Sequence, residues 1–134
     1  MGHPIPIQFD VFDESLDART HLIRVRGEIH VSTAPRLSER LDEAIADGKT
    51  AVVLDLSEVE FIDSTGLSVL LNGLRGIIRR QGAMALVCAN PTVLRLFQIT
   101  RLATTFDIHP TRAPALAWVR AQTAGAAGSS DGAP

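Results

Sequence analysis

Apolar and polar side chains follow one another along this chain in patterns that predict alternating strands and helices. Residues 5–12 and 20–29 are rich in Ile, Val and Phe, and in the second segment Ile23 and Val25 alternate with arginines. Such alternation is typical of a strand with water on at least one side. The turn-prone residues 13–17 separate the two segments, so we expect an opening hairpin.

The sequence next predicts a helix, a buried strand and a second helix, in that order along the chain. Apolar residues recur at helical spacing over residues 37–45, after Ser32 or Thr33, either of which can cap the helix. Residues 51–54 form a continuous apolar run, which is typical of a central strand covered on both faces. The clearest helical spacing covers about residues 64–81, and we expect a loop between this helix and the strand.

Four further elements complete the order ββαβαβαβα. They are a strand at 83–88, a helix opened by Asn90 and Pro91, a strand at 104–108 and a helix at 113–121. The sequence therefore predicts an α/β fold, in which a mixed, mostly parallel β-sheet is packed with α-helices in one domain over residues 5–121. Residues 122–134 are rich in Ala, Gly and Ser and have too little apolar surface to order themselves, so we expect a disordered tail.

The composition is that of an ordinary globular domain, and it removes several classes of function. The 134 residues suffice for one compact domain, with 46% hydrophobic and 21% charged residues. The net charge of −2 offers no cationic field for a nucleic acid. The single cysteine, Cys88, excludes an internal disulfide and a multi-cysteine zinc site. We expect Cys88 to be a small buried residue rather than a redox sensor.

The sequence shows no pattern of a membrane span or of a secretion signal. The most apolar window, residues 67–78, is interrupted by Asn72 and Arg75 and is shorter than the roughly 20 residues that cross a bilayer. The first residues lack both a basic start and a long apolar stretch. We therefore expect a cytoplasmic protein with no membrane partner.

Ser64, beside Asp63 and close to Gly66, invites comparison with the nucleophile elbow of hydrolases. That motif reads G-x-S-x-G, and here Ile62 stands where the first glycine permits the strained turn. The four histidines are scattered, without the i, i+4 pair of a helical metal site, and no phosphate-binding glycine loop is present. The sequence therefore predicts no catalytic site, no metal and no cofactor.

Asp63, Ser64 and Thr65 begin the clearest helix, and two roles are open to them. Either Asp63 or Ser64 can cap the helix by accepting free backbone N–H groups, which stabilises a helix by about 1 kcal/mol. Alternatively, three small polar residues beside Gly66 leave a hydroxyl at the helix end where a partner enzyme can reach it. Residue spacing alone leaves both roles open.

The segment Asp63–Leu67, preceded by the strand Val53–Leu56, resembles the phosphoacceptor loop of bacterial anti-sigma factor antagonists, which are built on the STAS domain. Two further segments agree with that family: Gly27–Ile29 followed by Ser32–Pro35, and Asn90-Pro91 leading into Leu94–Thr100. The resemblance covers about Ile5 to Arg120. It implies that Ser64 is phosphorylated by a partner that is both a serine kinase and an anti-sigma factor.

The resemblance further implies a partner switch. The unphosphorylated chain binds the anti-sigma factor and releases its sigma factor, whereas phosphorylation at Ser64 blocks binding. The kinase supplies the phosphoryl donor, Mg²⁺ and the base, so the chain is a substrate and regulator rather than an enzyme, and a cognate phosphatase reverses the step. The predicted partner-binding residues are Asp63, Ser64, Thr65, Gly66, Ser68, Val69, Asn72 and Gly73. An alternative is a STAS subunit of a membrane transport complex, in which Ser64 is only a helix cap.

Two residues depart from the family pattern. His30 stands where the family usually has Asp, and Ser68 where it usually has Gly. Ser68 is small enough to allow close approach of a partner. His30 is either a solvent-facing loop residue or a group titrating near about pH 6.5 that alters partner choice and pH response.

Overall fold

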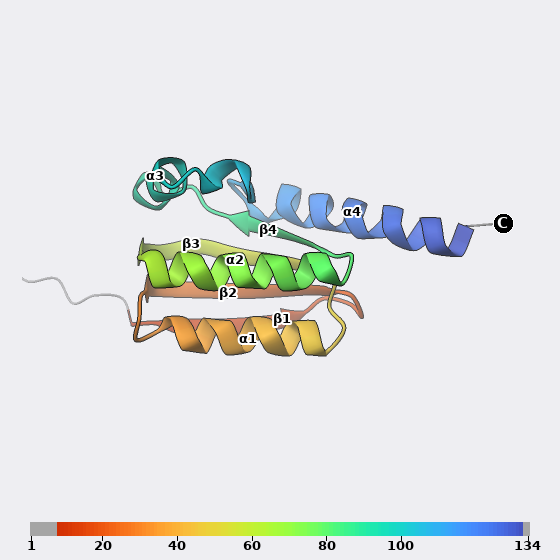
Figure 1. Cartoon of the computed structure of the whole chain (residues 1–134), viewed down its shortest axis with the longest axis horizontal. Helices are drawn as coiled ribbons and strands as arrows, with labels where there is room; N and C mark the ends of the chain where they lie inside the picture. The colour runs from red at the N-terminus through yellow and green to blue at the C-terminus, as the bar shows by residue number, and fades with distance from the viewer. Residues whose placement is uncertain (1–7, 133–134) are drawn as a thin grey trace, which may run out of the picture.

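The computed structural model describes residues 8–132, which form one sheet flanked by helices (Figure 1). The strands are β1 (Asp10–Ser15), β2 (Thr20–Ile29), β3 (Ala51–Ile62), β4 (Ala83–Val87) and β5 (Asp107–His109). The helices are α1 (Ala34–Ala46), α2 (Ser64–Arg79), α3 (Pro91–Ile99), the short 3-10 helix η1 (Leu102–Thr104) and α4 (Arg112–Gly132). The α/β class and the order ββαβαβαβα are confirmed.

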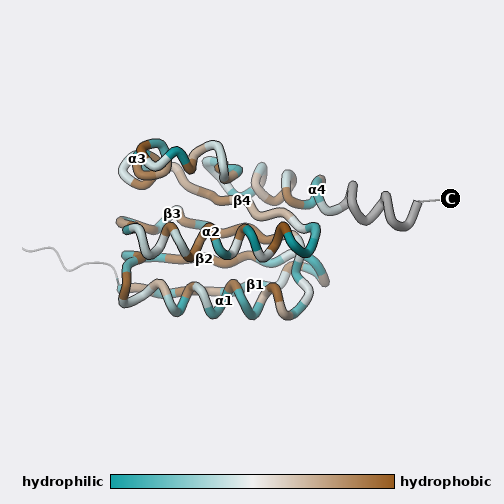
Figure 2. The backbone as a smooth tube through the Cα atoms, viewed as in Figure 1, coloured by the Kyte–Doolittle hydropathy of each residue, from teal (hydrophilic) through white to brown (hydrophobic). Residues whose placement is uncertain are grey.

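The five strands lie in the order β1-β2-β3-β4-β5, with β1 antiparallel to β2 and the other pairs parallel. Apolar residues of α1, α2 and α3 share one buried cluster with one face of the sheet. Ala115 and Val119 of α4 pack on the other face, against residues of β2, β3 and β4. Figure 2 shows α1 and α2 alternating between hydrophilic and hydrophobic residues, as expected for helices with one buried side.

Helices α1 and α2 lie side by side in front of the sheet, and glycines of α2 allow their close contact (Figure 1). A Cβ atom on Gly73 would lie 2.9 Å from the Cδ1 atom of Leu41, and one on Gly76 would lie 2.9 Å from the Cδ1 atom of Ile45. A side chain at either position would require the end of the Leu41 or Ile45 side chain to move. Helices α1 and α2 are therefore in close contact where Leu41 lies beside Gly73 and where Ile45 lies beside Gly76.

The first strand lies later in the chain than predicted. We expected a strand at 5–12 and a turn at 13–17, whereas β1 covers Asp10–Ser15 and residues 5–7 lie outside the described residues. The polar residues Asp13, Glu14 and Ser15 are compatible with a strand because β1 is at the edge of the sheet, where they are exposed. The bend comes afterwards, at Asp17, whose carboxylate accepts hydrogen bonds from the backbone N–H groups of Arg19 and Thr20.

Strand β3 is longer than predicted, because it continues through the expected loop to Ile62. Ser57, Glu58 and Glu60 are exposed, so this half of the strand lacks the apolar run of its first half. The pairing of β2 with β3 is also irregular, with register shifts between Arg24 and Arg26 and between Gly27 and Glu28. These shifts break the regular alternation by which a strand is recognised in a sequence.

The last strand and the last helix also differ from their predicted bounds. Strand β5 covers Asp107–His109 rather than 104–108, and η1 occupies part of the expected strand. Helix α4 continues from Arg112 to Gly132, across most of the segment 122–134 that we expected to be a disordered tail. Residues 133–134 lie outside the described residues.

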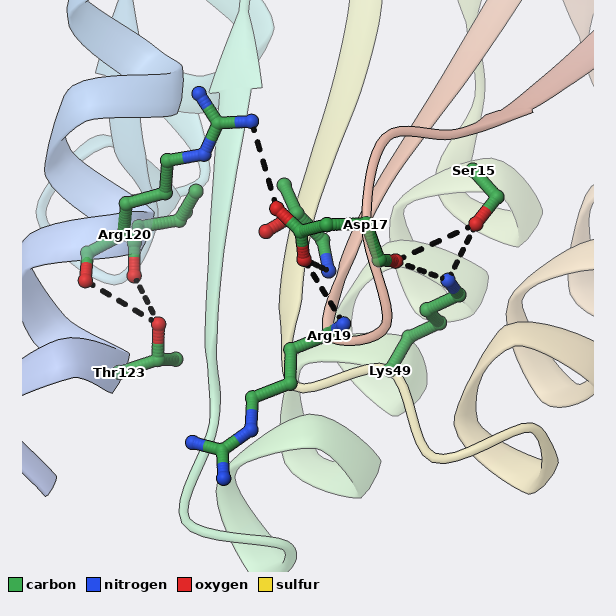
Figure 3. A network of polar contacts seen from close by, with 8 residues as sticks. Ser15, Asp17, Arg19, Lys49, Arg120 and Thr123 are labelled. Atoms are coloured by element: carbon green, nitrogen blue, oxygen red, sulfur yellow. Dashed lines mark hydrogen bonds and ion pairs between the residues drawn. The ribbon is translucent and has the colours of Figure 1, made fainter. Parts of the chain in front are cut away.

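A polar network ties the β1–β2 bend to the rest of the molecule (Figure 3). The Nζ atom of Lys49 donates to the Ser15 hydroxyl and to the Asp17 carbonyl oxygen, at 2.5 and 2.6 Å. The Asp17 carboxylate also lies 3.6 Å from the Arg120 guanidinium of α4. Hydrogen bonds from the backbone of Arg19 and then from Thr20 lower the pKa of Asp17. This network lies where β2 and β3 begin, at the opposite end of these strands from Ser64.

A buried carboxylate joins α4 to β3. Asp55 is 3% exposed, and its carboxylate accepts hydrogen bonds from Ser57 and from the Nε atom of Arg112. Burial raises the pKa of Asp55, but the hydrogen bonds from Ser57 and the Arg112 guanidinium together outweigh it, so the pKa lies below its ordinary value.

None of the helices within residues 8–132 combines the length and the apolar run that a bilayer crossing requires.

Candidate functional site

The three segments singled out in the sequence meet at one end of the sheet. They follow β2, β3 and β4, which are parallel, so their carboxyl ends share one edge. The backbone N–H of Asp63 donates to the carbonyl oxygen of Ile29 at 3.1 Å. The side-chain amide of Asn90 donates to the carbonyl oxygen of Val59 at 3.2 Å. The loops on both sides therefore hold the β3–α2 junction, where Ser64 lies.

Asp63, not Ser64, caps α2. The Asp63 carboxylate accepts a hydrogen bond from the backbone N–H of Gly66 at 3.0 Å, and the Asp63 backbone is extended, with φ −101° and ψ −175°. Ser64 is the first residue of the helix and is exposed, and its hydroxyl makes no hydrogen bond to any residue in the described part of the chain. The Ser64 hydroxyl is thus free to react or to be contacted from solution.

Gly66 holds the first turn of α2 close to the sheet. A Cβ atom on Gly66 would lie 2.6 Å from the Cγ1 atom of Ile62 and 2.8 Å from the Cγ2 atom of Ile29. Any side chain there would push the turn outward, away from the ends of β2 and β3. Gly66 therefore fixes how far Ser64 stands above the sheet.

Thr33 and Asn90 order the two neighbouring loops. The Thr33 hydroxyl donates to the carbonyl oxygen of Glu28 at 2.7 Å and accepts from the backbone N–H of His30 at 3.0 Å, so it makes no cap bond to α1 although it precedes that helix. The Asn90 side-chain oxygen accepts from the backbone N–H of Thr92 at 2.9 Å and so caps α3. Each of these side chains closes the loop in which it lies.

The predicted partner-binding residues separate into surface and interior positions. Ser64, Ser68 and Asn72 are exposed, Asp63, Thr65 and Val69 are half-buried, and Gly66 and Gly73 are buried. We predicted Gly73 as a partner-binding residue, but it faces Leu41 of α1 rather than the exposed side of α2. Gly66 and Gly73 are buried and set the position of α2, and a partner contact at either of them stays a prediction.

One exposed stripe runs along the whole of α2. It consists of Ser64, Ser68, Asn72, Arg75 and Arg79, which recur at helical spacing and are all exposed. Arg75 and Arg79 were absent from the predicted partner-binding residues. The helical period of α2 was the signal for them, because residues three or four apart share a face.

His30 lies in the loop after β2, whereas Cys88 is buried after β4. The Nδ1 atom of His30 accepts from the backbone N–H of Ser32 at 3.2 Å, and its Nε2 atom lies 3.9 Å from a carboxylate oxygen of Glu28. Cys88 is 2% exposed, as expected, and burial raises the pKa of its thiol. Among the side chains of residues 8–123, no three from His, Cys, Asp or Glu gather closely enough to hold a metal ion.

The profile of the STAS domain matches residues 15–115 of the chain. The chain belongs to the STAS domain family. A relative named "Anti-sigma-B factor antagonist", from Listeria monocytogenes serovar 1/2a, is 38% identical over 88 residues, which are 64% of this chain and 75% of the relative. Its name describes the listerial protein as an antagonist of an anti-sigma factor.

Solved structures share the fold of this STAS domain. An anti-sigma factor antagonist from Mycobacterium paratuberculosis superposes with a TM-score of 0.77 at 34% identity, over 84% of this chain and 95% of the other. SpoIIAA in its unphosphorylated form has a TM-score of 0.72 at 24% identity, over 85% and 97% of the two chains. Bacillus SpoIIAA in the phosphorylated form has a TM-score of 0.65 at 24% identity, over 84% and 100%.

Proposed function

We propose that this STAS domain is an anti-sigma factor antagonist that works by partner switching at Ser64. Unphosphorylated, it binds an anti-sigma factor that is also a serine kinase, and the bound sigma factor is released. Phosphorylated at Ser64, it does not bind. The observation that carries the proposal is the exposed Ser64 hydroxyl, which Asp63 frees by taking the cap of α2.

Phosphorylation at this position changes the surface while the fold is retained. A phosphoryl group transferred to the Oγ atom of Ser64 adds a charge of about −1.5 to −2 beside the Asp63 carboxylate. The first-turn N–H groups of α2 can donate hydrogen bonds to an anion, and the helix dipole favours negative charge there, so the phosphorylated chain stays folded. Inside a desolvated contact the same charge is costly, and the complex with the partner dissociates.

The chain acts as the substrate in this reaction and not as an enzyme. The kinase supplies the nucleotide donor, Mg²⁺ and the base that takes the hydroxyl proton, and this chain needs no cofactor of its own. A cognate phosphatase removes the phosphoryl group and restores binding. Because the kinase, the sigma factor and this chain must meet, the switch operates in the cytoplasm.

Two observations support this function over a structural role in a membrane transport complex. In that alternative Ser64 serves only as a helix cap, but the hydrogen bond from Gly66 goes to Asp63. The similarity to proteins named anti-sigma factor antagonists further supports the switch. Within the described residues, the Ser64 side chain accepts no hydrogen bond from a backbone N–H group of α2, as a helix cap would.

The test is isothermal calorimetry against the anti-sigma factor kinase of the same organism. We expect Ser64→Asp to remain folded and to lose at least about a hundredfold in affinity, because a buried charge without a partner costs several kcal/mol. Ser64→Ala should bind like the wild type and take up no phosphate. Thr105→Asp is the control, since Thr105 is exposed and lies outside α2.

Two results would change this assignment. Tight binding of the kinase by Ser64→Asp would mean that no charge-operated switch exists at this residue. Phosphopeptide mapping to the half-buried Thr65 would move the modification by one residue along α2.

A further inference from the structure

The exposed sides of α1 and α2 carry charges of opposite sign. Helix α1 exposes Glu39, Asp42 and Glu43, whereas α2 contains no acidic residue and exposes Arg75 and Arg79. We call the first set the acidic row and the second the basic row. Surfaces that only need to be soluble usually mix the two signs, so their separation onto neighbouring helices is informative.

The arginines of α1 do not neutralise the acidic row, because both are engaged toward β1. Arg40 forms an ion pair with Asp13 of β1 at 3.1 Å. The guanidinium carbon of Arg36 lies 5.0 Å from the ring centroid of Phe9, which precedes β1. The surface that α1 presents beside α2 is therefore acidic.

The two rows also leave each other unpaired. Among the side chains of residues 8–123, no ion pair involves a member of either row, although other charged residues do form ion pairs. The helices themselves are in contact, as Gly73 and Leu41 show. Charges that are unpaired in the monomer remain available to a second molecule.

The basic row is continuous with the proposed phosphorylation site. Ser64, Ser68, Asn72, Arg75 and Arg79 form the exposed stripe of α2, and Arg75 lies about three turns, or about 16 Å, along the helix from Ser64. An ordinary protein interface covers about 800 Å² on each partner. An interface of that size that begins at Ser64 and extends along α2 would cover Arg75 and the neighbouring part of α1.

We infer that the partner that docks on Ser64 carries two charge patches, an acidic one that faces Arg75 and Arg79 and a basic one that faces the acidic row. This inference rests on the proposed function and names the chemistry of its partner. A partner surface of one sign would be repelled by one of the two helices. A surface with both signs is attracted in one orientation only, which fixes the direction of docking and selects among related kinases.

The experiment reverses one charge in each row and measures binding of the same kinase by calorimetry at low and high salt. Arg75→Glu and Asp42→Lys are each expected to weaken binding about tenfold at low salt, and the effect should shrink at about 1 M salt, where charges are screened within about 3 Å. Arg19→Glu and Glu14→Lys are the matched controls, because both residues are exposed and lie outside α1 and α2. We expect the controls to bind like the wild type.

Ser64→Asp is measured in parallel, so that failure of this inference and failure of the proposed function are distinguishable. If Ser64→Asp loses affinity while Arg75→Glu and Asp42→Lys bind like the wild type, the switch stands and the two-patch partner is wrong. If one reversal weakens binding and the other strengthens it, the partner surface has a single sign and the inference is overturned. If the chain alone forms a dimer that either reversal dissociates, and kinase binding is unaffected, the rows pair with a second copy instead.

Discussion

Replacing Asp63 and Ser64 separately by alanine tests which of them is structural. The Asp63 carboxylate lies 3.0 Å from the backbone N–H of Gly66, and Asp63 is half-buried. Loss of such an N-cap costs about 1 kcal/mol, and loss of the negative charge at the helix N-terminus adds about 0.3–1 kcal/mol. We therefore expect Asp63→Ala to lower the free energy of unfolding by about 1–2 kcal/mol.

Ser64→Ala should behave differently, because the Ser64 side chain is exposed and makes no hydrogen bond to the described residues. Alanine also has a higher helix propensity than serine, which offsets any small loss. The free energy of unfolding should stay within about 0.5 kcal/mol of the wild type.

The assay is urea and thermal unfolding followed by circular dichroism, and it needs no partner. A loss of 1–2 kcal/mol corresponds to a fall in Tm of about 3–8 °C for a domain of this size. Asp63→Asn is the control, because asparagine caps helices about as well as aspartate. A loss for Ser64→Ala as large as that for Asp63→Ala would mean that the hydroxyl is engaged, and the proposed function would lose its main observation.

Four further changes test other parts of the structure. Arg112→Met removes the cation beside buried Asp55 and should cost about 2 kcal/mol at pH 7. Because the folded pKa of Asp55 lies below its ordinary value of 3.8, this stabilisation is present above about pH 4 and is lost as the pH falls, so urea titrations of the variant should show a shallower acid decline. Asn90→Ala should cost about 1–2 kcal/mol and speed amide hydrogen exchange in α3 more than in α1, since the amide both caps α3 and holds Val59. Truncation after Thr123 should leave the Tm within about 2 °C by calorimetric scanning, because no periodic apolar positions follow it. Cys88→Ala should bind the kinase like the wild type, because Cys88 is buried.

Elements with a strong local signal could be predicted from the sequence, and elements that depend on distant contacts could not. Helix α2 was predicted nearly to its last residue because its buried leucines and isoleucines repeat at helical spacing. The second half of β3 was missed because Ser57, Glu58 and Glu60 lie on exposed positions. Whether a strand position is covered depends on where helices pack, which local periodicity does not contain.

In the candidate site, too, some features could be predicted from the sequence and others depend on the folded structure. Ser64 was reached through the resemblance of Asp63–Leu67 to a known phosphoacceptor loop. The choice between Asp63 and Ser64 as the cap depends on backbone angles at the β3–α2 junction, which the residue types alone leave open. Gly73 lies three residues after Leu70 and four before Ile77, so the helical period of α2 was the signal for its burial, whereas its contact with Leu41 of α1 depends on how the two helices pack.

The three sequence segments belong together because each supplies a backbone restraint near Ser64. Ile29 accepts the Asp63 N–H, Asn90 holds the Val59 carbonyl, and Gly66 seats the first turn on Ile62. These contacts use backbone groups, the Asn90 side-chain amide and buried apolar atoms, and the Ser64 hydroxyl takes part in none of them. A phosphoryl group on that hydroxyl therefore changes the charge of the surface without breaking any contact that holds the loop. A switch read by a partner needs this separation, because the partner must distinguish two charge states of one fold rather than a folded from an unfolded chain.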